Sequence, residues 1–139
     1  MSEVKNRKEL LNKLSISQLN EMQAKVIPAI EKNANTIIIS PTGSGKTVAF
    51  LLPLLESLNG ELDEVQALIL VPSRELAIQI DNVARTMGSG LKINAVYGGR
   101  SIQKDKNELQ HLPAILIGTP GRIGDHLRHE RVNTKTIHT

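Results

Sequence analysis

The hydrophobic positions of this 139-residue chain form short apolar runs that alternate with longer segments of helical periodicity. The apolar runs predict strands at 36–39, 66–71, 92–96 and 114–117. The periodic segments predict helices at 46–58, 74–87 and 102–110, with one more that starts at Pro120. Strands that alternate with helices in this way indicate an α/β fold, in which a parallel sheet carries helices on both faces in three layers.

Two helices are predicted before the first strand. The first is basic and amphipathic and covers 4–14, and the second covers Glu21–Lys32. Asn20 is a suitable cap for the second helix, and Gln23 lies three residues later, as in a capping box. We therefore expect two units, an N-terminal helical segment at 1–35 and an α/β segment at 36–139.

The stretch Thr36–Thr47, TIIISPTGSGKT, has the layout of a nucleotide-phosphate cradle: strand, glycine-rich turn, Lys-Thr and helix. Gly43 and Gly45 allow backbone N–H groups to close on phosphate oxygens, and the positive end of the helix dipole faces the same anion. Lys46 adds a charge for the β- and γ-phosphates, and the Thr47 hydroxyl suits a Mg²⁺ ligand. The alternative is an ordinary strand-to-helix turn with a solvated surface lysine.

Each of the other predicted strands is followed by a turn with an arginine: Pro72-Ser73-Arg74, Gly98-Gly99-Arg100 and Thr119-Pro120-Gly121-Arg122. Ser73 and Thr119 are predicted helix caps, so Arg74 and Arg122 fall in first turns, where a cation opposes the helix dipole unless an anion binds there. Gly98-Gly99 would let a sugar-phosphate backbone approach closely. Because parallel strands end at one edge of a sheet, we expect these turns to form one anion-binding edge. At each position a surface arginine, a plain cap or a plain turn is the alternative.

Composition narrows the classes of function. Hydrophobic residues make up 40% of the chain, which is typical of a globular protein, and no apolar run approaches the ~18 residues of a membrane span. The charged N-terminus lacks the apolar core of a secretory signal, and the absence of cysteine fits a cytoplasmic location. The net charge of +3 permits a polyanionic partner. Tyr97 and Phe50 are the only aromatic residues, so any nucleic acid would be held by its backbone and not by base stacking.

These motifs resemble, in order and spacing, the first RecA-like domain of a DEAD-box ATP-dependent RNA helicase, a P-loop NTPase domain. The matching segments are Ser40–Thr47 (motif I, where this family has alanine and not glycine first), Pro72–Ala77 (motif Ia, with Ser73 for threonine), Gly98-Gly99 (the GG motif) and Thr119–Arg122 (motif Ib). The resemblance runs from about Leu14 to Arg131.

The resemblance implies ATP or ADP bound with Mg²⁺, and RNA bound through its backbone. The residues implied for the nucleotide are Gln23, Ser40, Pro41, Thr42, Gly43, Ser44, Gly45, Lys46 and Thr47, of which Lys46 and Thr47 are catalytic and Thr47 holds the metal. The residues implied for RNA are Pro72, Arg74, Gly98, Gly99, Arg100, Thr119, Pro120, Gly121 and Arg122.

Two departures from the family pattern matter. Gln23 stands where the family's Q motif reads adenine, but its surroundings differ, with Ile16 for an aromatic residue, Leu19 and Glu21 for prolines and Asn20 for a threonine. Its alternative role is the capping box, and the two roles are compatible. The acidic DEAD sequence itself is absent, and Thr136–Thr139 resembles the start of the strand that would carry it.

We therefore expect an incomplete first domain that binds nucleotide and RNA, hydrolyses ATP negligibly by itself, and associates through open sheet edges. Two alternatives remain open: a non-enzymatic nucleic-acid-binding module, and a DNA helicase or another P-loop ATPase.

Overall fold

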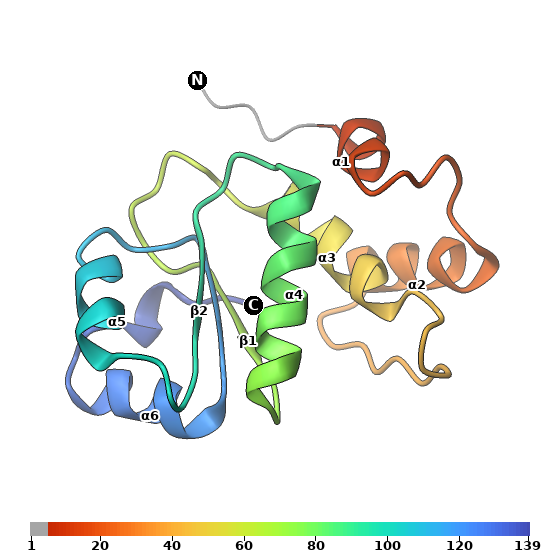
Figure 1. Cartoon of the computed structure of the whole chain (residues 1–139). Coiled ribbons are helices and arrows are strands. Elements are labelled where there is room, and N and C mark those ends of the chain that lie inside the picture. Colours follow the sequence, from red (N-terminus) through yellow and green to blue (C-terminus); the bar gives the residue numbers. More distant parts are fainter. Residues whose placement is uncertain (1–5) are drawn as a thin grey trace.

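The structure is a computed structural model that describes residues 6–139 (Figure 1). Its sheet has three parallel strands in the order β1-β3-β2, namely β1 (Ala67–Leu70), β2 (Ile93–Val96) and β3 (Ile115–Gly118). Ile69 of β1 and Ala95 of β2 both pair with Ile117, which places β3 at the centre of the sheet. Three of the predicted strands are thereby confirmed.

Helices cover both faces of this sheet, so the predicted three-layer architecture is confirmed (Figure 1). Ile115 and Ile117 point into a core shared with α3 (Lys46–Ser57) and α4 (Arg74–Met87). Leu116 points to the opposite face, where it packs with α5 (Ile102–Glu108) and α6 (Pro120–Arg128). This alternation follows from the two-residue period of side chains along a strand.

The N-terminal helices α1 (Arg7–Lys13) and α2 (Glu21–Lys32) pack on α3 and α4 and share the larger core through Leu10 and Ile27. Arg7 links the three helices by hydrogen bonds to Glu56 on α3 at 2.7 Å and Glu31 on α2 at 2.6 Å. Residues 4 and 5 of the predicted first helix lie outside the described part of the chain.

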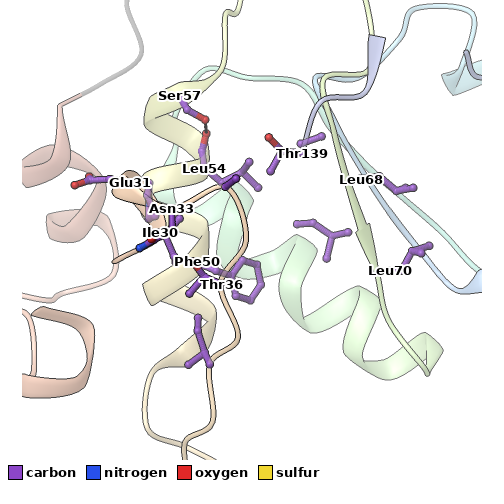
Figure 2. Close-up of a pocket in the computed structure, with 15 residues that line it drawn as sticks. Ile30, Glu31, Asn33, Thr36, Phe50, Leu54, Ser57, Leu68, Leu70 and Thr139 are labelled. Atoms are coloured by element: carbon purple, nitrogen blue, oxygen red, sulfur yellow. Dashed lines mark hydrogen bonds between the residues drawn. The ribbon is translucent and has the colours of Figure 1, made fainter. Parts of the chain in front are cut away.

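The predicted strand at 36–39 is wrong. This segment has no strand pairing, and the side chains of Ile37 and Ile39 are 90% and 94% exposed. Thr36 and Ile38 instead line one side of a hollow of about 700 Å³, whose other side is β1 (Figure 2). Without an adjacent strand to supply backbone hydrogen bonds, β-branched side chains do not form a strand by themselves.

The C-terminal residues run beside the free edge of β1. After a short 3₁₀ turn, η1 (Thr134–Thr136), the His138 N–H donates to the Gln66 carbonyl at 3.0 Å. The Leu68 N–H donates to the Thr139 carbonyl at 2.9 Å, and Thr139 reaches the hollow in Figure 2. The segment expected to begin a strand thus lies along the sheet edge at which a further strand would pair.

Candidate functional site

The turn between residue 40 and α3 has the backbone of an anion cradle. The Ser44 N–H donates to the Pro41 carbonyl at 3.3 Å, and Gly43 and Gly45 take the left-handed φ values 78° and 89° that favour glycine. Gly45 is the N-cap of α3, and no side chain caps the helix there. The first N–H groups of α3 therefore point out of the helix without an intrahelical acceptor, as an anion requires.

Lys46 is folded over this loop. Its ammonium donates to the carbonyls of Ser40 at 2.5 Å and Pro41 at 2.9 Å. Two of the loop hydroxyls, those of Ser40 and Ser44, lie 2.6 Å apart. The positive charge is therefore held beside the loop that precedes α3.

Gln23 connects α2 to the same loop. Its Oε1 accepts from the Asn20 N–H at 3.0 Å, and the Asn20 Oδ1 accepts from the Gln23 N–H at 2.8 Å, so the predicted capping box is present. Gln23 Nε2 also donates to the Gly45 carbonyl at 3.2 Å, and Asn20 Nδ2 donates to the Ser44 carbonyl at 2.9 Å. A Cβ atom on Gly45 would lie 2.5 Å from Gln23 Nε2, so this close contact, as well as the left-handed φ, favours glycine at this position. The sequence pattern did not predict these contacts with the loop.

The turns after β1, β2 and β3 converge as the parallel topology requires. Gly98, Thr119, Gly121 and Arg122 line one hollow of about 580 Å³. Arg74 reaches the same glycine turn, since a Cβ atom on Gly99 would lie 3.2 Å from Arg74 Nη1. The hollow has three further lining residues that the sequence did not indicate, Ile102, Asp125 and Arg128.

The helices that begin at this edge differ in whether a side chain caps their first N–H groups. Ser73 Oγ accepts from the Leu76 N–H at 3.2 Å and so caps α4, as predicted. Thr119 is the N-cap residue of α6, and Pro120 is its first helical residue, but the threonine side chain makes no capping bond. Pro72 and Pro120 are both exposed. Thr119 and Gly121, at the open N-terminus of α6, therefore line the hollow.

The three arginines do not lie alike. The Arg74 side chain is 55% exposed, and within residues 6–139 its one ion pair is with its neighbour Glu75, at 3.6 Å. Arg100 is only 12% exposed and pairs with Asp105 and Glu108, and Arg122 is 14% exposed and pairs with Asp105 at 3.2 Å. The structure thus presents one of the three guanidiniums to solvent and turns the other two toward α5.

His126 completes the arrangement behind this edge. It is fully buried on α6, and its Nε2 lies 2.9 Å from Asp105 Oδ2. Burial lowers the pKa of His126 to about 4, and the cations Arg131, Arg122 and Arg100 act in the same direction. The ring is therefore neutral at neutral pH. Asp105 and His126 were not predicted from the sequence. One signal was available for Asp105: it lies four residues before the buried Leu109 and so on the same helical face.

Most of this chain is similar in sequence to known proteins. The sequence model of the DEAD/DEAH box helicase family matches residues 20–139. The chain is 40% identical over 133 residues to the DEAD-box ATP-dependent RNA helicase CshB of Listeria monocytogenes, which covers 93% of this chain and 31% of that protein. It is 39% identical over 123 residues to the ATP-dependent RNA helicase DeaD of Escherichia coli K12, across 86% of this chain and 20% of that protein.

A solved structure gives the same result for the fold. The chain resembles the crystal structure of a DEAD box protein from the hyperthermophile Methanococcus jannaschii with a TM-score of 0.86 and 34% identity, over 96% of this chain and 37% of that one. The chain spans about a third or less of the length of these relatives. The family model matches far more than half of the described residues, and the RecA-like sheet agrees, so this chain belongs to the DEAD/DEAH box helicase family.

Proposed function

We propose that this chain is the ATP- and RNA-binding N-terminal part of an ATP-dependent RNA helicase. The observation that supports this most directly is the loop before α3, in which Gly43 and Gly45 adopt left-handed conformations and Lys46 folds over an uncapped helix start. Membership of the helicase family supports the same assignment. Because ATP and RNA are both abundant in the cytoplasm, we propose that compartment for the protein.

In this proposal the segment from Ser40 to Thr47 binds the phosphates of ATP or ADP. The open N–H groups of the loop and of α3 donate to phosphate oxygens, and Lys46 exchanges its two carbonyl acceptors for the β- and γ-phosphates. Gln23 keeps Gly45 in place, and the second N–H of its amide group is the candidate contact for adenine.

Mg²⁺ fits the residues present. Thr47, on the first turn of α3, would supply a hydroxyl ligand, and Mg²⁺ commonly takes one or two protein ligands and completes its shell with phosphates and water. When bound, the ion neutralises charge on the transferring phosphate. The acidic DEAD sequence is absent from this sequence. We therefore expect this chain alone to hydrolyse ATP negligibly, since positioning and charge neutralisation supply most of the rate of phosphoryl transfer and the carboxylates of that motif would contribute to both.

RNA is proposed to lie along the edge formed by the turns after the three strands. Arg74 offers an exposed guanidinium, and the amides of Gly98-Gly99 and the open start of α6 at Thr119–Arg122 offer backbone donors. These contacts address the sugar-phosphate backbone, which fits a chain with a single tyrosine, a single phenylalanine and no tryptophan.

Nucleotide binding is tested by calorimetric titration of ADP and Mg²⁺ into the protein and its Lys46→Ala variant. Loss of binding is expected, because the variant removes the charge beside the loop. Lys25→Ala is the matched control, since Lys25 lies on α2 and pairs with Glu21 at 2.9 Å. Equal ADP affinity of Lys46→Ala and the parent protein would remove the loop from the mechanism.

RNA binding is tested by fluorescence anisotropy with labelled RNA and DNA strands of equal length at two salt concentrations. We expect weak binding of RNA that decreases with salt through a few phosphate contacts. A preference for DNA would indicate a DNA helicase. In a longer natural protein that contains this chain, RNA binding with no response to ATP would indicate a non-enzymatic module.

A further inference from the structure

A buried carboxylate joins the two glycine-containing turns of the proposed RNA edge. Asp105 on α5 has no exposed surface, and its Oδ1 accepts from Arg100, which directly follows Gly98-Gly99. Its Oδ2 accepts from Arg122 Nη1 at 3.2 Å and lies 2.9 Å from His126 Nε2. One side chain of α5 thus contacts the turn after β2 and the first and second turns of α6.

Further bonds close this cluster. Arg122 Nη2 donates to the Arg100 carbonyl at 2.8 Å, so the two turns are also joined directly. Arg100 Nη2 donates to Glu108 at 2.7 Å, and Arg131 Nη1 lies 3.2 Å from His126 Nδ1. Every polar atom of the Asp105 carboxylate is therefore engaged, and two arginines that would otherwise face solvent are held inward. A carboxylate in this setting fixes geometry, since each of its two oxygens accepts a charge-assisted bond from a different arginine.

We propose that Asp105 is a positioning residue for RNA binding. It holds the Gly98-Gly99 turn and the start of α6 in fixed relative positions, so that the N–H groups of both can contact the RNA backbone. It also keeps the guanidiniums of Arg100 and Arg122 away from the RNA phosphates. The proposal rests on the RNA-binding function proposed above. It assigns phosphate contact to backbone N–H groups and to Arg74, and it assigns Arg122 an indirect role. Asp105 itself touches no ligand.

Removal of the Asp105 charge separates this proposal from a purely electrostatic role by the sign of the effect. Asp105→Asn removes one negative charge, which raises the net charge by one unit, and it releases two guanidiniums near the RNA edge. If those guanidiniums bound phosphate, RNA affinity would rise, because each added cation strengthens binding to nucleic acid. If the carboxylate positions the turns, RNA affinity falls in spite of the added charge.

The experiment measures the anisotropy of a labelled single-stranded RNA of about ten nucleotides with the 139-residue chain and its variants. Asp81→Asn is the matched control, because Asp81 pairs with Arg85 at 2.9 Å on α4 and its replacement makes the same change in charge. We expect Asp105→Asn to bind RNA about tenfold more weakly, a change on the order of the loss of one hydrogen bond to a charged phosphate group. We expect Asp81→Asn to bind as well as the parent protein, and ADP affinity to stay within about twofold in both.

Amide hydrogen exchange provides a readout that needs no RNA. In Asp105→Asn, exchange should accelerate at 98–100 and 119–123 and stay unchanged at 43–47. Asp105→Glu keeps the charge but displaces the carboxylate, so it should show a smaller change of the same pattern and recover part of the RNA affinity. It also serves as the test variant if Asp105→Asn does not fold.

The possible results are distinct. Unchanged or raised RNA affinity in a folded Asp105→Asn protein overturns the positioning role, and so does unchanged exchange at both turns. If the parent protein itself fails to bind RNA, the proposed RNA-binding function fails and the positioning role fails with it. Faster exchange at both turns would then show only that the Asp105 contacts stabilise the fold.

Discussion

His126 makes the stability of this protein depend on pH in a way that one substitution can isolate. The ring is buried between α5 and α6 and has a pKa of about 4, against 6.5 for an ordinary histidine. The charged and hydrogen-bonding groups that face it are Arg131, Arg122, Arg100, Asp125 and Asp105. His126→Gln keeps a side-chain N–H donor for Asp105 and cannot be protonated.

The sign follows from the two pKa values. Between pH 6.5 and 4 the unfolded chain binds a proton at this histidine that the folded protein does not bind, so stability falls as pH falls through that window. The contribution is fully present above pH 6.5, and below pH 4 its loss is complete at about 3 kcal/mol, from 1.36 kcal/mol for each pKa unit. About 2 kcal/mol of this is lost between pH 7 and pH 5.

The assay is denaturant unfolding of the parent protein and His126→Gln at several pH values from 7 to 4.5. Carboxylates that titrate in the same range affect both proteins, so the difference between the two curves isolates His126. We expect the parent protein to lose about 2 kcal/mol more than the variant between pH 7 and pH 5. Parallel curves would refute a neutral buried His126, as would an NMR titration in which the resonance missing from the variant shifts with a pKa above 6.

Three further substitutions test the packing. Asn94→Leu should raise the free energy of unfolding by about 1 kcal/mol in thermal or urea unfolding, because Asn94 Nδ2 is buried and without a hydrogen-bond partner in the described part of the chain; a loss of stability would contradict this. Gly118→Ala should cost about 1–3 kcal/mol, since its Cβ would lie 2.7 Å from a backbone carbonyl oxygen of β2. Gly121→Ala, on α6, meets open space and should leave stability unchanged or raise it by up to ~1 kcal/mol; equal losses in the two variants would argue against the described packing. Ile37→Lys should weaken self-association in sedimentation experiments, because Ile37 is 90% exposed on the segment 36–39, which pairs with no strand in the described part of the chain, and Ile78→Lys on α4, where Ile78 is 38% exposed, should not; association that neither change affects would exclude this segment.

Local signals in the sequence account for the elements that were predicted well. The predicted bounds of α2 and α4 match the structure, because Asn20 and Ser73 cap their first turns and Gly88 ends α4 with a left-handed φ of 63°. The phosphate loop was predictable for the same reason, since the glycines and the lysine that shape it lie within a few consecutive residues.

Features that depend on distant residues were not predictable. The run at 36–39 has the composition of a buried strand, but a strand also needs a neighbour, and the hollow beside β1 separates it from the sheet. Asp105 is a charged residue on a short helix, and a local pattern assigns such a residue to the surface. Its burial depends on Arg122, which lies 17 residues away, and that pairing exists only after α5 and α6 pack on the same face of the sheet.

The most direct test of the proposed function is a crystal structure of this chain grown with excess ADP and Mg²⁺. We expect the diphosphate to lie on the N–H groups between Gly43 and Thr47, with the Lys46 ammonium turned from the Ser40 and Pro41 carbonyls toward the β-phosphate. A loop that is open to solvent but free of nucleotide, with Lys46 still bonded to both carbonyls, would contradict it.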